Sequence, residues 1–102
     1  MRTILVMTMV AVFAAISPAS ASDAELAAKG RGTYHLYCGL CHGPNLVNRG
    51  TKTYDLRKFP LDQPERFIKS VKNGKGQMPP WGDRLSDDDI AALWAYVKTG
   101  GK

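Results

Sequence analysis

Hydrophobic residues recur at helical spacing in three segments of the chain, and no segment alternates as a β-strand does. The clearest segment lies near the C-terminus, where Ile90, Leu93, Trp94 and Val97 follow the i, i+3, i+4, i+7 spacing of one helix face. Ser86 precedes them, and three aspartates occupy the first turn, where the helix dipole favours negative charge. This pattern predicts a helix that begins at Ser86.

A second helix is predicted before the two cysteines. Ser22 and Glu25 have the spacing of a capping box, in which side chains satisfy free backbone donors at a helix start. One side of the helix carries Leu26, Ala27, Gly30, Tyr34 and Cys38. A glycine inside a helix costs about 1 kcal/mol relative to alanine, so we expect Gly30 to permit close packing.

The third predicted helix lies between the other two. Asp62 is its expected N-cap, Pro64 falls in its first turn, and Asn73-Gly74 ends it. Its apolar face consists of Phe67, Ile68 and Val71. Residues 43–59 are rich in glycine, asparagine and threonine without sustained periodicity and are expected to form a loop. Three helices and no strand predict an all-α fold.

The first 21 residues have the pattern of a signal peptide. Arg2 precedes an apolar run of 13 residues, Ile4–Ile16, and Ala19-Ser20-Ala21 supplies small residues for cleavage. The run is shorter than the ~17–20 residues that a membrane-spanning helix needs, so we expect cleavage after Ala21 and not a retained anchor. The sequence predicts a periplasmic protein of residues 22–102, without stable membrane insertion after cleavage.

The predicted mature segment is small and moderately basic. Its 81 residues form one domain, of a size at which a hydrophobic core alone is marginally stable and a further staple is expected. It carries 13 lysines and arginines against 9 acidic residues, a net charge of +4. These basic residues do not cluster with stacking aromatics, and the protein is exported, so we expect no nucleic-acid partner.

The two cysteines and the next residue, His42, form the sequence Cys38-Gly39-Leu40-Cys41-His42. A disulfide here would close a very small loop and stabilise the fold little. A thioredoxin-like site lacks its strands, and a zinc site would need His35, which precedes the pair. The complete C-x-x-C-H pattern is that of covalent haem c attachment, with thioethers to Cys38 and Cys41 and His42 on the iron.

A second axial ligand must come from elsewhere in the chain. Three of the four methionines lie in the predicted signal peptide, which leaves Met78 between glycines and prolines in the run 74–81. We therefore predict His42 and Met78 as the iron ligands. Two alternatives stay open: Met78 as a core residue that fills a gap, and His35 as ligand of a bis-histidine haem with a lower potential.

These motifs resemble those of the class I c-type cytochromes over residues 22–102. Gly30 and Tyr34 stand eight and four residues before the first cysteine, and Leu93 and Tyr96 stand three apart in the last helix, as in that family. The resemblance implies a small cytochrome c fold, with three main helices around one haem, and Met78 as distal ligand. The family's histidine-orienting proline generally lies further along than Pro44, whose role is left open.

The spacing of the ligands also departs from that of the family. Only 36 positions separate His42 from Met78, which implies a trimmed form with one haem edge less covered.

Filled axial positions leave no open site for oxygen or peroxide, so we expect an electron carrier and not an enzyme. It would cycle between Fe(III) and Fe(II), linking a dehydrogenase or respiratory complex to a terminal acceptor. The run 55–82 is similar to periplasmic cytochromes that accept electrons from quinoprotein alcohol dehydrogenases, and a cytochrome oxidase is another candidate partner. The alternatives are a haem-based sensor or enzyme with labile Met78, and a fixed subunit of a larger redox complex.

Two further groups of residues have weaker assignments. Trp81, Tyr54 and Arg57 are candidates to bind the haem propionates, although packing explains the two aromatic residues equally well. A docking patch near Met78 would consist of Lys69, Lys72 and Lys75. Simple solvation of a charged helix face is the alternative for these lysines.

Overall fold

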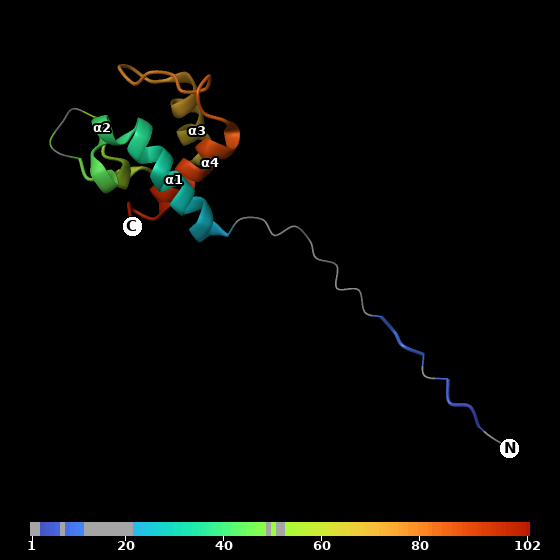
Figure 1. Cartoon of the computed structure of the whole chain (residues 1–102). Coiled ribbons are helices and arrows are strands. Elements are labelled where there is room, and N and C mark those ends of the chain that lie inside the picture. The colour runs from blue at the N-terminus through green and yellow to red at the C-terminus, as the bar shows by residue number, and fades with distance from the viewer. Residues whose placement is uncertain (1–2, 7, 12–21, 49, 51–52) are drawn as a thin grey trace.

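The computed structural model describes residues 3–6, 8–11, 22–48, 50 and 53–102 of the chain. Within these ranges there are helices and no strands, which confirms the predicted all-α fold (Figure 1). The elements in chain order are α1 (Asp23–Tyr37), α2 (Gly39–His42), η1 (Pro44–Leu46), η2 (Leu56–Lys58), α3 (Pro64–Asn73) and α4 (Asp87–Lys98). No described helix has both the length and the apolar character needed to cross a membrane.

The N-terminal segment has little described structure. Residues 3–6 and 8–11 are exposed and have no regular secondary structure. The predicted cleavage position after Ala21 lies outside the described residues. Ser22 is the N-cap of helix α1, and its hydroxyl accepts a hydrogen bond from the Glu25 backbone N–H at 3.2 Å. This is one of the two bonds of the expected capping box.

Helix α4 is the centre of the hydrophobic core. Ser86 and Asp89 form both bonds of a capping box at its start, and Ile90, Leu93, Trp94 and Val97 are all buried, as predicted. This N-cap was expected at Ser86 from the sequence. The remaining buried residues of the helix are Ala92, Ala95 and Tyr96.

Helices α1 and α4 pack closely against one another (Figure 1). At the crossing, a Cβ atom on Gly30 would lie 1.9 Å from the carbonyl oxygen of Ala92, so no larger residue fits there. The rings of Tyr34 and Tyr96 pack beside this point with centroids 5.2 Å apart. The expectation that Gly30 permits a close helix contact is confirmed.

Helix α3 packs on α4 through aromatic rings, with the centroids of Phe67 and Trp94 5.1 Å apart. The predicted N-cap at Asp62 is wrong by one residue, because Gln63 holds that position. Pro64 takes the first helical position, where its fixed φ suits the helix and its missing N–H costs no hydrogen bond. The helix ends at Gly74, whose φ of 74° is a left-handed conformation that favours glycine.

In its described residues, the loop expected at 43–59 contains two short 3-10 turns, η1 and η2. Turn η1 begins at Pro44, two residues after His42, and buries Leu46 completely. The C-terminal end lies against this turn, because a Cβ atom on Gly101 would lie 2.0 Å from the carbonyl oxygen of Asn45. The C-terminal end therefore packs against the turn that follows the cysteines.

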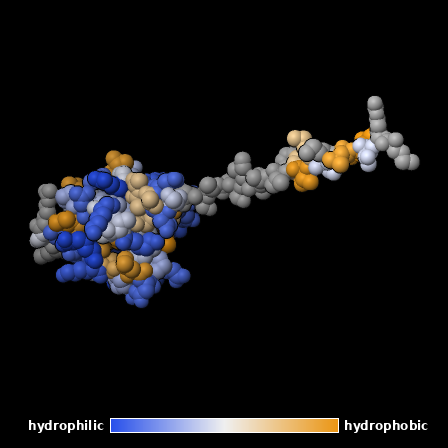
Figure 2. All heavy atoms as spheres, turned by 90° about the horizontal axis from the view of Figure 1, so that it is seen from below, coloured by the Kyte–Doolittle hydropathy of each residue, from blue (hydrophilic) through white to orange (hydrophobic). Residues whose placement is uncertain are grey.

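The face of the helical domain seen in Figure 2 is mostly hydrophilic, with separate hydrophobic side chains between the polar ones. The most exposed large apolar side chain of this domain is Leu40, at 97%. It lies between the two cysteines.

Candidate functional site

All four predicted site residues line one cavity of about 580 Å³, which is a usual size for a small-molecule or cofactor pocket. These residues are Cys38, Cys41, His42 and Met78. The walls come from the end of α1, α2, the η2 segment, α3, α4 and the run that contains Met78. His35 is exposed on α1 and is not among the lining residues.

A single backbone turn presents the two cysteines and His42 to the cavity. The Cys38 N–H donates to the Tyr34 carbonyl at 2.8 Å, and the N–H groups of Cys41 and His42 donate to the Cys38 carbonyl at 3.2 and 2.9 Å. Both cysteines are free thiols, Cys38 partly buried and Cys41 exposed. Burial, and to a smaller extent the nearby Cys41, raises the pKa of the Cys38 thiol to about 11.

His42 is oriented by a backbone carbonyl from a distant part of the loop. Its Nδ1 lies 3.1 Å from the carbonyl oxygen of Tyr54. Since a carbonyl only accepts, Nδ1 carries the proton, and Nε2 keeps the lone pair that a metal ion needs. Tyr54, and not Pro44, supplies the orienting oxygen. No sequence motif signals this contact, because a backbone carbonyl has no residue signature.

Tyr34 fixes the chain directly after His42. Its hydroxyl is buried and donates a hydrogen bond to the carbonyl of Gly43. Gly43 has a φ of 89°, and a Cβ there would lie 1.9 Å from the Val47 carbonyl oxygen. Burial, followed by the charges of Cys38 and Tyr96, raises the pKa of Tyr34 to about 12. The hydroxyl therefore stays protonated and remains a donor at neutral pH.

Met78 lies on a tight turn in residues 74–82, here called the Met78 loop. Lys75 and Met78 exchange backbone hydrogen bonds of 3.2 and 3.0 Å across this turn. Gly74 allows the close approach, because a Cβ there would lie 2.4 Å from the Met78 carbonyl oxygen. The Trp81 N–H donates to the Val71 carbonyl at 2.8 Å and ties the loop to α3. The thioether is thus presented by a fixed backbone.

The charged side chains that line the cavity are basic. Arg66 and Lys75 are among the lining residues, and among the residues that the structure describes no aspartate or glutamate lines the cavity. The Arg66 guanidinium lies 5.2 Å from the centroid of the Phe59 ring and donates to Gln63 at 3.2 Å. A cavity with this lining favours an apolar ligand that carries negative groups.

Arg57, a candidate propionate residue, does not line the cavity. Its guanidinium donates twice to the Asp55 carboxylate, each time at 3.1 Å, and this contact lowers the pKa of Asp55. Tyr54 and Trp81, the other two candidates, do line it. Arg66 was missed, although it stands four residues before Ser70 and shares the cavity side of α3.

The three lysines of the predicted docking patch have different surroundings. Lys75 lines the cavity and Lys69 is exposed. The Lys72 ammonium forms an ion pair with the Asp87 carboxylate. The patch is therefore partly neutralised by an acidic residue of α4.

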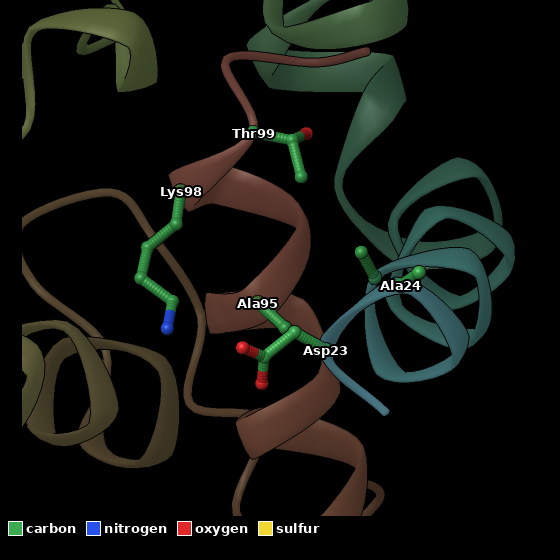
Figure 3. A pocket seen from close by; sticks show the side chains of 6 residues that line it. Asp23, Ala24, Ala95, Lys98 and Thr99 are labelled. Carbon is green, nitrogen blue, oxygen red and sulfur yellow. The ribbon is translucent and has the colours of Figure 1, made fainter. Parts of the chain in front are cut away.

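The donor set fits haem c better than the alternatives. The thiols and the imidazole come from one short segment and the thioether from another, and Tyr34, Leu56, Phe59 and Leu93 supply apolar walls. Among the described residues no three His, Cys, Asp or Glu side chains come close enough to hold a metal ion. A second depression of about 290 Å³, between the start of α1 and the end of α4, contains no cysteine, histidine or methionine (Figure 3).

Comparison with known proteins gives consistent similarities. A family model described as cytochrome c oxidase, cbb3-type, subunit III, matches residues 25–97. Cytochrome c6 of Gloeothece citriformis is 39% identical over 90 residues, 83% of this chain and 78% of that protein. Cytochrome c6 of Tetradesmus obliquus is 40% identical over 78 residues, 69% of this chain and 85% of that protein.

A solved structure is similar as well. Cytochrome c6 of the diatom Phaeodactylum tricornutum aligns with a TM-score of 0.59 and 32% identity. The alignment covers 72% of this chain and 97% of that one. The fold and the sequence therefore point to the same group of proteins.

Proposed function

The chain belongs to the class I c-type cytochromes and is a haem c electron carrier, and from this premise we propose that His42 and Met78 are the axial ligands. The observation that supports this ligand pair is the position of both side chains on one cavity with Cys38 and Cys41. Bound through thioethers to the two cysteines, haem c supplies a one-electron Fe(III)/Fe(II) couple.

The protein's own residues hold the ligands in place. The Tyr54 carbonyl keeps the proton on Nδ1 of His42 and leaves Nε2 for the iron. The paired backbone of Lys75 and Met78 presents the thioether from the other segment, and thioether ligation gives a higher potential than a second histidine. With both positions filled, no site is left for oxygen or peroxide.

Arg66 and Lys75 are the proposed partners of the haem propionates, with Tyr54 and Trp81 as further donors. These four side chains line the cavity, whereas the Arg57 guanidinium is bound to Asp55. Cationic and neutral donors stabilise carboxylates that would otherwise be poorly solvated.

We also propose that residues 1–21 are a signal peptide and that the protein works in the periplasm. The intact mass of the periplasmic protein tests this, since cleavage after Ala21 leaves a chain that starts at Ser22 and carries one haem. A mass that includes residues 1–21 would contradict the proposal.

The partners are redox proteins. We propose a quinoprotein alcohol dehydrogenase or a cytochrome oxidase as a partner, and the resemblance of the run 55–82 suggests the dehydrogenase. The net positive charge of the chain favours acidic docking surfaces on these partners. Rates of electron exchange that fall steeply with salt would support such docking, and rates insensitive to salt would contradict it.

The ligand assignment is tested with Met78→Ala and the control His35→Ala. Voltammetry and optical spectra of both haem-loaded variants are compared with the wild type. We expect Met78→Ala to lose the sulfur-to-iron charge-transfer band and to bind carbon monoxide, while His35→Ala keeps the wild-type spectrum and potential. The opposite pattern would establish the bis-histidine alternative.

A second candidate function is that of a fixed subunit in a larger redox complex. The description of the matching family, subunit III of a cbb3-type oxidase, favours it. Size-exclusion chromatography of an untreated periplasmic extract separates the two: a diffusible carrier elutes at its monomer mass, and a fixed subunit elutes with its partner.

A further inference from the structure

We propose that Tyr37 and Trp81 form an aromatic latch that positions the Met78 loop against the segment that carries Cys38. The proposal rests on the proposed function, because it concerns the stability of Met78 as a ligand. The two rings join parts of the chain that are far apart in sequence. Tyr37 is the last residue of α1 and directly precedes Cys38, and Trp81 follows Met78 by three positions.

The contact between the two rings has favourable aromatic geometry. Their centroids lie 5.4 Å apart with an interplanar angle of 59°. Tilted aromatic pairs at 4.5–7 Å are attractive beyond their buried area. Both rings line the cavity, so together they close one part of its wall.

Trp81 is itself held firmly and can transmit the contact to Met78. The backbone N–H of Trp81 donates to the Val71 carbonyl at 2.8 Å, and the Arg84 guanidinium lies 5.7 Å from the centroid of the Trp81 ring. Two prolines separate Trp81 from Met78, and their rings fix φ at both positions. A movement of Met78 out of the cavity therefore requires the tryptophan to move as well.

The attachments of the Met78 loop lead to different parts of the molecule. The Lys75–Met78 pair closes the loop on itself, and backbone bonds from Trp81 to Val71 and from Gly82 to Lys72 tie it to α3. The ring of Tyr37 ties it to the segment that carries the cysteines. Loss of the Tyr37 contact should leave the fold intact and make loop opening more frequent.

The size of the effect follows from the strength of one aromatic pair. The pair is formed when the Met78 loop is closed and broken when the loop is open. Its loss is therefore expected to change the rate of loop opening roughly twofold to tenfold. Tyr37 is 40% exposed, so its truncation removes little core packing.

The experiment measures how fast imidazole replaces Met78 in the oxidised, haem-loaded protein, followed by loss of the sulfur-to-iron charge-transfer band. We expect Tyr37→Ala and Trp81→Leu each to raise this rate roughly twofold to tenfold, and the double variant to exceed neither single variant by much, since both remove one contact. Tyr37→Phe keeps the ring and should behave as the wild type. Leu36→Ala, at the adjacent residue that is 77% exposed, is the matched control and should also leave the rate unchanged.

Equal rates for Tyr37→Ala and Leu36→Ala, with the band present, would overturn the latch and leave the ligand assignment standing. Absence of the band from the wild type would overturn both. Thermal unfolding of each variant is recorded in parallel. A rate that merely follows the unfolding midpoint across all variants would contradict a specific role of the two rings.

Discussion

Replacing Gly30 with alanine should destabilise the protein strongly, whereas the same replacement at Gly32 should stabilise it. The two glycines lie two residues apart in α1. At Gly30 the new Cβ would be 1.9 Å from the Ala92 carbonyl oxygen and 2.4 Å from the carbonyl carbon. At Gly32 nothing lies within 4 Å of the added atom.

The magnitude follows from what must move. An ordinary contact begins at 3.4 Å, so α4 has to shift by about 1.5 Å from α1 at the Gly30 crossing. Overpacking costs about 1–3 kcal/mol, and the upper end applies because backbone atoms have no rotamer to relieve the clash. Alanine regains about 1 kcal/mol of helix propensity at either position. We therefore expect a net loss of about 2 kcal/mol or more for Gly30→Ala and a gain of about 0.5–1 kcal/mol for Gly32→Ala.

Guanidinium denaturation of the haem-loaded proteins, followed by circular dichroism, measures both changes. If the unfolding free energy depends on guanidinium concentration with the same slope in both variants and the wild type, the differences between the midpoints give the differences in stability directly. Equal midpoints for Gly30→Ala and Gly32→Ala would refute the reasoning, because the close crossing of α1 and α4 would then be absent.

Three other perturbations have expected outcomes. Ser86→Ala removes the N-cap of α4 and should cost about 1 kcal/mol, seen as a lower thermal midpoint by roughly 4–8 °C. Since burial raises the pKa of Tyr34 above its usual value of 10.0, its contribution to stability is complete below pH 10 and is lost as the pH rises through the raised pKa. As the pH rises through this range, the free energy of unfolding should fall less steeply for Tyr34→Phe than for the wild type. The variant also loses the hydrogen bond to the Gly43 carbonyl. Arg66→Gln should lower the reduction potential by roughly 20–40 mV, the one-electron equivalent of about 0.5–1 kcal/mol, while Arg57→Gln leaves it unchanged in voltammetry.

Local signals in the sequence account for most of the fold. The start of α4 follows from the capping pair at Ser86 and the acidic first turn, both within one helical turn of each other. Gly30 was predictable for a different reason: a glycine that costs helix propensity in the middle of a helix needs a packing explanation. The short range of these signals explains why the helices were predicted to within a residue or two.

Contacts that depend on the path of the loop were not predictable. The Tyr54 carbonyl meets His42 across 12 residues and involves no side chain of Tyr54. Arg57 was a candidate propionate residue and Arg66 was not, because the sequence does not show that Asp55, two residues away, binds the Arg57 guanidinium. The start of α3 was placed at Asp62 by its capping preference, but Pro64 fixed the first turn.

The optical spectrum of the haem-loaded protein, oxidised and then reduced, with and without carbon monoxide, tests the central claim most directly. We expect a covalent low-spin haem with a sulfur-to-iron charge-transfer band when oxidised, and no change on addition of carbon monoxide when reduced. A high-spin spectrum or ready carbon monoxide binding would contradict Met78 as a firm ligand. A protein without haem would contradict the assignment of Cys38 and Cys41.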